Sequence, residues 1–191
     1  MDADQLIAEG LRLARPSLVL RAGGCGGRPA GYWGGAGAVP PPPGDWRHWL
    51  TVECGWLHDQ GLPLRGCLSL YEAAGDVLEF AALADAEKGL PEPLPGSTPL
   101  FGEEEPSIPP CEALTVCGSD AAYDREYQRR CPLYRDDVYA VLGGWHTFWP
   151  DMDVYDEEKG RLVLWTFHEA EPWIEVWLDK DGRLKAVPRV T

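Results

Sequence analysis

The amino-acid sequence predicts an α+β fold in which strands predominate and helices are few. Three observations carry this prediction. Apolar and polar residues alternate through several short runs, which is the pattern of strands with one buried face. Turns rich in Gly and Pro separate these runs. Helical spacing of apolar residues is instead confined to the N-terminus, and one further polar segment has a composition that favours a helix.

Two segments are predicted to be helical. Apolar residues recur at helical spacing from Leu6 to Ala14, before Pro16, so we expect a helix over 3–14. A second, short helix is expected near 120–131, because a run of helix-favouring residues there ends at Pro132.

The predicted strands are short and come mostly in pairs. Turn residues such as Lys180, Asp181 and Gly182 connect neighbouring runs, as in β-hairpins. The strands are expected at 17–21, 49–56, 64–71, 77–83, 114–117, 138–142, 161–168, 173–178 and 184–190.

The chain is predicted to be one domain over 1–191, and its two halves share an order of features. Gly34-Gly35 in the first half and Gly143-Gly144 in the second each precede a Pro-bearing loop that ends in Asp, followed by a strand pair. Repeated halves over 17–88 and 113–191, joined by an irregular Pro- and Glu-rich loop at 89–112, are one interpretation. Recurrence of common turn chemistry is the other.

Composition predicts a cytoplasmic protein. The N-terminal residues are acidic where a secretory signal is basic, and no apolar run reaches the length of a membrane span. The six cysteines are therefore expected to be thiols. Neither the cysteines nor the four histidines have the spacing of a metal site, and no phosphate-binding loop occurs, so no metal or cofactor is predicted.

The formal net charge of -14 indicates the class of partner. A strongly acidic chain repels phosphate backbones and anionic lipid, so nucleic-acid and membrane partners are not expected. A basic protein partner is favoured instead. The alternative is that the charge only keeps the protein dispersed.

Aromatic and acidic residues gather in three segments that are predicted to be exposed loops. Aromatic faces beside carboxylates suit a sugar, a cationic group or an Arg-bearing surface. Alternatively, the rings fold back onto the sheet and the carboxylates are solvated. The candidate binding residues are Trp145, His146, Trp149, Asp151, Asp153, Asp156, Glu157, Glu158, Glu103, Glu104 and Glu105.

No pattern identifies a catalytic set. Glu169 and Glu171, with Asp151 and Asp153, could supply an acid and a base, but that chemistry needs a fixed separation that the sequence does not specify. Cys25 lies among glycines without an identifiable activating partner. No catalytic residue is therefore predicted.

The chain resembles the YwqG-like family of bacterial proteins. The resemblance runs through residues 32–46 and 48–72, with their Gly-Gly and Leu-Pro segments, and through 140–151, with the second Gly-Gly loop. It implies a duplicated α+β domain without an established catalytic centre. Some relatives look like immunity proteins encoded beside toxin genes.

Charge, acidic loops and the resemblance together predict a non-enzymatic binding protein, an immunity-type inhibitor that covers a basic toxin surface. The alternative is a small-molecule or carbohydrate-binding domain, with or without hydrolytic activity, that uses Trp145, Trp149, Asp151 and Glu171. A third interpretation is an interaction domain without a ligand.

Overall fold

A computed structural model describes residues 3–23, 27–75, 78–92, 95–110, 114, 121–132, 135–145, 160–166 and 173–189 of the chain. Ten strands and three helices lie in these ranges. The helices are α1 (Ala3–Arg12), α2 (Gly55–Asp59) and α3 (Ala121–Arg130). The strands are β1 (Arg15–Ala22), β2 (Gly31–Trp33), β3 (Trp46–Glu53), β4 (Cys67–Ala73), β5 (Phe80–Asp85), β6 (Thr98–Ser107), β7 (Val138–Gly143), β8 (Gly160–Thr166), β9 (Trp173–Asp179) and β10 (Leu184–Arg189).

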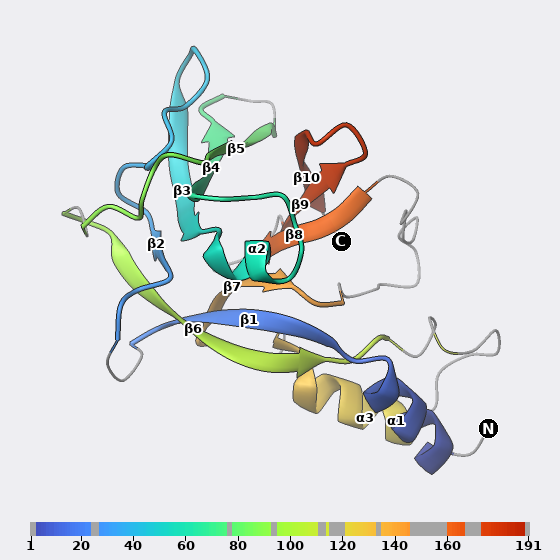
Figure 1. The fold of residues 1–191 in the computed structure, drawn as a ribbon. Helices are drawn as coiled ribbons and strands as arrows, with labels where there is room; N and C mark the ends of the chain where they lie inside the picture. The colour runs from blue at the N-terminus through green and yellow to red at the C-terminus, as the bar shows by residue number, and fades with distance from the viewer. Residues whose placement is uncertain are drawn as a thin grey trace.

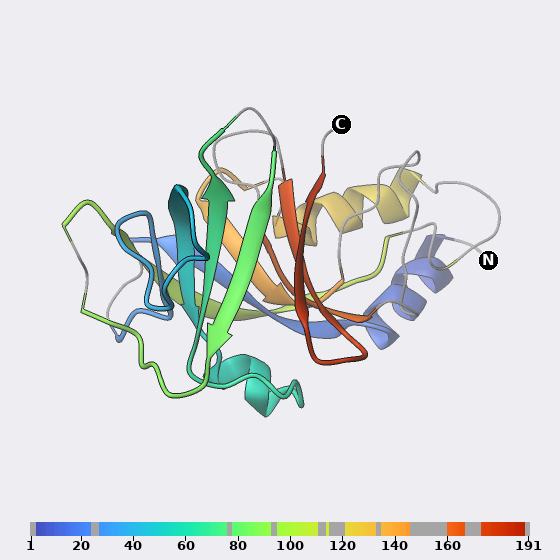
Figure 2. The same ribbon diagram turned by 90° about the horizontal axis from the view of Figure 1, so that it is seen from above.

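All these strands belong to one antiparallel sheet, in the order β10-β9-β8-β7-β1-β6-β2-β3-β4-β5. The sheet curls until its edge strands, β5 and β10, lie beside each other (Figure 2). The molecule is therefore nearly a barrel, and the predicted β-rich α+β class is confirmed. No helix within the described ranges is both long and apolar enough to span a bilayer.

Side chains that point inward from the curled sheet form the main hydrophobic core. Leu50 and Val52 on β3, and Leu68 and Leu70 on β4, alternate with outward-facing residues and have no exposed surface. Full burial of each such side chain contributes about 1.5–3 kcal/mol. The alternation seen in the sequence is thus the alternation between core and outer face.

The short helix α2 and the turn after it cover one end of the barrel (Figure 1). Leu57 on α2 and Leu62 and Leu64 after it are buried in the same core as the strands. Trp56 was predicted to end a strand over 49–56, and this is wrong, because β3 ends at Glu53 and Trp56 belongs to α2. An alternating pattern does not distinguish a strand end from one helical turn.

Helices α1 and α3 pack against each other outside the sheet (Figure 1). A Cβ at Gly10 would lie 2.3 Å from the Tyr123 hydroxyl oxygen, so glycine permits this close contact. The buried Tyr123 hydroxyl donates a hydrogen bond of 2.7 Å to the carbonyl oxygen of Pro109. Both helices were predicted from the sequence and are confirmed within two residues at each end.

An irregular loop was predicted over 89–112. That prediction is wrong for Thr98–Ser107, because these residues form strand β6. β6 lies in the middle of the sheet and pairs with β1 on one side and β2 on the other. A central strand can accommodate the Glu105 carboxylate because Arg21 and Arg135, from outside the strand, form ion pairs with it. Close packing also explains Gly102, where a Cβ would lie 2.9 Å from the Leu18 side chain.

The other predicted strands correspond to observed strands, apart from 114–117. Residue Leu114 lies in a turn, and 115–117 fall outside the described residues. The hairpin predicted between the second and third strands is confirmed, since β3 pairs with β4.

The strand order is symmetric about the β1–β6 pair. The four strands from β2 to β5 run outward from β6, and the four from β7 to β10 run outward from β1. We call these the first and the second meander. This symmetry is compatible with two repeated halves, whose common origin stays a prediction.

We predict that Leu142→Ala, on β7, lowers the free energy of unfolding by about 2–5 kcal/mol, because Leu142 is fully buried and its loss leaves a cavity. Urea unfolding measures this change. The matched control is Leu78→Ala, whose side chain is 44% exposed and should change stability by about 0.5 kcal/mol or less. Equal effects at both positions would contradict the proposed core.

Candidate functional site

Most of the predicted binding residues lie outside the described residues. These are His146, Trp149, Asp151, Asp153, Asp156, Glu157 and Glu158, together with Glu169 and Glu171 of the carboxylate alternative. The structure therefore places only Trp145 and the three glutamates of β6.

The three glutamates are engaged to different degrees by other side chains. The Glu105 carboxylate accepts hydrogen bonds from Arg21 at 2.5 Å and from Arg135 at 2.7 Å. Glu104 accepts the indole N–H of Trp56 at 3.0 Å. Glu103 has 69% of its side chain exposed, and Arg21 lies 3.6 Å from its carboxylate. The predicted acidic patch on β6 is thus partly neutralised.

Trp145 packs against the segment between α1 and β1. Its indole N–H donates to the Leu13 carbonyl oxygen at 2.9 Å, and its backbone N–H donates to the Ser107 hydroxyl at 2.9 Å. The Arg15 guanidinium lies over the indole ring, 3.5 Å from the ring centroid. The Trp145 ring therefore makes a cation–π contact with Arg15 of the same chain.

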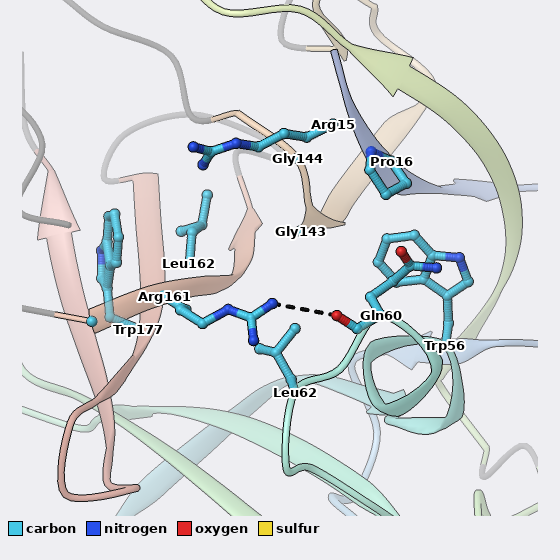
Figure 3. Close-up of a pocket in the computed structure, with 11 residues that line it drawn as sticks. Arg15, Pro16, Trp56, Gln60, Leu62, Gly143, Gly144, Arg161, Leu162 and Trp177 are labelled. Carbon is cyan, nitrogen blue, oxygen red and sulfur yellow. Dashed lines mark hydrogen bonds between the residues drawn. The ribbon is translucent and has the colours of Figure 1, made fainter. Parts of the chain in front are cut away.

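A cleft of about 530 Å³ opens beside this segment, between α2, the end of β7 and the strands β8 and β9 (Figure 3). In Figure 3, Arg15 extends along one side of the cleft and Arg161 along the opposite side. Trp56 and Trp177 contribute half-buried aromatic walls at its two ends. The volume is in the range of small-molecule sites.

Among the described residues that line the cleft, the two charged ones are arginines. Arg161 donates hydrogen bonds to the backbone carbonyl oxygens of Gly61 at 3.0 Å and of Gln60 at 3.3 Å. Carbonyl oxygens orient a guanidinium without cancelling its charge. The described lining of the cleft is consequently positive within a chain of net charge -14.

Gly143 and Gly144 give the cleft its shape at the end of β7. Their φ angles of 63° and 78° lie in the left-handed region, which glycine adopts without strain. A Cβ at Gly143 would lie 3.2 Å from the Trp56 ring, and one at Gly144 would lie 2.9 Å from the Ser17 Cβ. Glycine at both positions thus permits a close approach of the backbone to Trp56 and Ser17.

Sequence reasoning missed four residues of the cleft: Arg15, Trp56, Arg161 and Trp177. They come from four separate stretches of the chain, and no spacing links them. The one available signal was the Gly143-Gly144 pair. The negative net charge favoured carboxylates as candidate binding residues, and no local pattern marked these arginines.

A second polar cluster lies under the Gly34-Gly35 turn. His48 is buried, and burial lowers its pKa, so the ring is neutral at pH 7. Because a carbonyl oxygen only accepts, the His48 Nδ1–H donates to Gly34 at 3.1 Å, which leaves Nε2 to accept from the Thr51 hydroxyl at 2.8 Å. Thr51 in turn lies 2.8 Å from the Ser69 hydroxyl, which accepts the Val39 N–H.

The described cysteines do not form a reactive or metal-binding group. Cys54 and Cys67 are buried free thiols, and Cys131 is buried as well. Burial raises the pKa of Cys54 to about 12 and that of Cys67 to about 11, so neither forms a thiolate at neutral pH. Within the described ranges, no three His, Cys, Asp or Glu side chains gather as a metal site.

Comparisons with known proteins gave no match: no protein-family model, no curated protein and no solved structure is significantly similar to the chain. The resemblance to the YwqG-like family stays a prediction.

We predict that His48 makes the fold less stable as the pH falls below about 6.5. The unfolded chain binds a proton at this histidine in that range, whereas burial lowers the pKa in the folded chain, so acid favours unfolding. The free energy of unfolding, measured between pH 5 and 7, should depend less on pH in His48→Gln. Replacing the exposed His58 by Gln is the control, and an unchanged slope in His48→Gln would refute the assignment.

Proposed function

We propose that this protein is a binding protein, and that the cleft beside α2 takes a small ligand with an anionic group and a flat apolar part. The observation that carries the proposal is the pair of arginines, Arg15 and Arg161, on opposite sides of the cleft. Guanidinium groups bind carboxylate and phosphate oxygens through paired hydrogen bonds.

The net charge of -14 does not outweigh this local charge. At physiological ionic strength the Debye length is about 8 Å, so carboxylates farther away are largely screened from a ligand in the cleft. Arginines that line the cleft act at contact distance, where electrostatic attraction is strongest. Among the described residues that line the cleft, the charged groups that a ligand anion contacts are therefore the arginines.

The apolar walls support a flat organic ligand over a bare inorganic anion. Trp56 and Trp177 present half-buried rings, and Leu162 and the buried Leu62 add apolar surface between them. Pockets with mostly apolar walls and a few polar groups are typical of organic ligands. We assign no reaction to this cleft.

We predict that Arg161→Gln weakens binding of an anionic aromatic probe by about tenfold to a hundredfold, since a hydrogen bond to a charged group is worth about 1.5–3 kcal/mol. Titration calorimetry with 2-naphthoate and 2-naphthyl phosphate measures the loss and tells a carboxylate site from a phosphate site. The neutral 2-naphthol should bind the wild-type protein more weakly than either.

Arg161→Lys, which keeps the charge, should retain part of the affinity. The matched control is Arg125→Gln on α3, an exposed arginine that does not line the cleft. The proposal is wrong if 2-naphthol binds as tightly as the anions, or if Arg125→Gln weakens binding as much as Arg161→Gln does.

We also propose, as a second candidate, the acidic inhibitor of a basic toxin that the sequence predicts. The exposed Glu103 on β6 supports it, together with the net charge of -14. Surface charges of this kind accelerate association with a basic partner and lose their effect at high salt.

For this candidate we predict that the protein captures the product of an adjacent gene at low salt. Glu103→Lys should slow the association measured by surface plasmon resonance, because it reverses a charge on the proposed contact surface. Glu92→Lys, at another exposed position, is the control. Capture of nothing encoded nearby, or equal slowing by both variants, would count against an inhibitor.

A further inference from the structure

The two meanders place an arginine at the same position relative to a β-bulge. In the first meander the register of β3 with β4 shifts after His48, and Arg47 comes directly before it. In the second, the register of β8 with β9 shifts after Leu162, and Arg161 comes directly before it. Arg47 is therefore the counterpart of Arg161.

The two Gly-Gly turns correspond in the same way. Gly34-Gly35 follows β2, the strand that begins the first meander, and Gly143-Gly144 ends β7, which begins the second. Gly34 and Gly35 have φ angles of 71° and 70°, again in the left-handed region. Both meanders thus combine a left-handed glycine turn with an arginine on the next strand.

A second cleft, of about 460 Å³, lies at the first meander's turn. Gly34, Gly35 and Arg47 line it, as their counterparts line the first cleft. The other described lining residues are His48 and three tryptophans, Trp33, Trp46 and Trp49.

The Arg47 side chain is exposed, and no described residue pairs with it through a hydrogen bond or an ion pair. Glu72 lies opposite Arg47 in the β3–β4 register, but its carboxylate accepts the indole N–H of Trp49 at 2.9 Å. The Arg47 guanidinium, which has no ion pair within the described residues, can therefore donate hydrogen bonds to a ligand. Glu72 contributes to this cleft by fixing the Trp49 ring.

Aromatic contacts hold the walls of the second cleft in place. The Trp33 and Trp49 rings lie 5.4 Å apart at 56°, and the edge-to-face contact of Trp49 with Phe80 spans 5.3 Å. The hydrogen bond from His48 to Gly34 joins the turn to β3. The cleft is therefore built before any ligand binds, which lowers the entropy lost on binding.

We infer that the cleft formed by Trp33, Trp46, Trp49 and Arg47 is a second binding site for anionic aromatic ligands, so that one chain binds two. The inference rests on the proposed function for the class of ligand, because both clefts join an arginine to tryptophan walls. Arg47 binds the carboxylate or phosphate of the ligand, and the indole rings contact its flat face.

The test is calorimetry with 2-naphthyl phosphate and 2-naphthoate on the wild-type chain, Arg47→Gln, Arg161→Gln and the double variant. We expect two equivalents per wild-type chain. Each single variant should lose about tenfold or more in affinity at one site, and the double variant at both. Arg125→Gln controls for the charge change, and thermal unfolding confirms that each variant folds.

Indole N–H signals in ¹H–¹⁵N spectra assign each loss to a cleft. Arg47→Gln should abolish the ligand-induced shifts of Trp46 and Trp49 and leave those of Trp56 and Trp177. One equivalent of ligand, with binding unaffected by Arg47→Gln, would overturn the second site and leave the proposed function standing. Loss on Arg47→Gln alone would instead support the second site and refute the first.

Discussion

Antiparallel pairing of β1 with β6 joins the two meanders into one sheet. β1 also pairs with β7, and β6 also pairs with β2, so each central strand links to one meander. Leu18 and Leu20 on β1 enter the core that both meanders share, while Val19 packs on the outer face. Because β1 and β6 are far apart in the sequence, this contact closes a long loop, and the barrel forms only once it is made.

The first cleft depends on the same junction. Ser17 of β1 pairs with Gly143 of β7, which brings Arg15 next to the Gly143-Gly144 turn. Trp56 reaches the cleft from α2, which follows β3 in the first meander. The cleft therefore contains residues from both meanders, and neither alone would form it.

Total charge and local charge point to different partners in this molecule. The net charge of -14 suggests a cationic partner. Two of the glutamates on β6, however, already accept hydrogen bonds from Arg21, Arg135 and Trp56. Arg47 and Arg161 instead line clefts and form no ion pair with a described residue. A ligand responds to the charges it contacts, since distant ones are screened by salt. The arrangement of charge is thus more informative here than its sum.

The sequence by itself determined the class of fold and most of the strands, because side chains that alternate between the core and the outer face leave a local pattern, as in β3. It also indicated the Gly143-Gly144 turn, since left-handed backbone requires glycine. Tertiary structure alone decided that the Pro- and Glu-rich segment at 98–107 is the central strand β6. Tertiary structure alone also placed Arg15 and Arg161 on opposite sides of one cleft. Pairing between distant strands decides which side chains meet, and no local sequence pattern records that pairing.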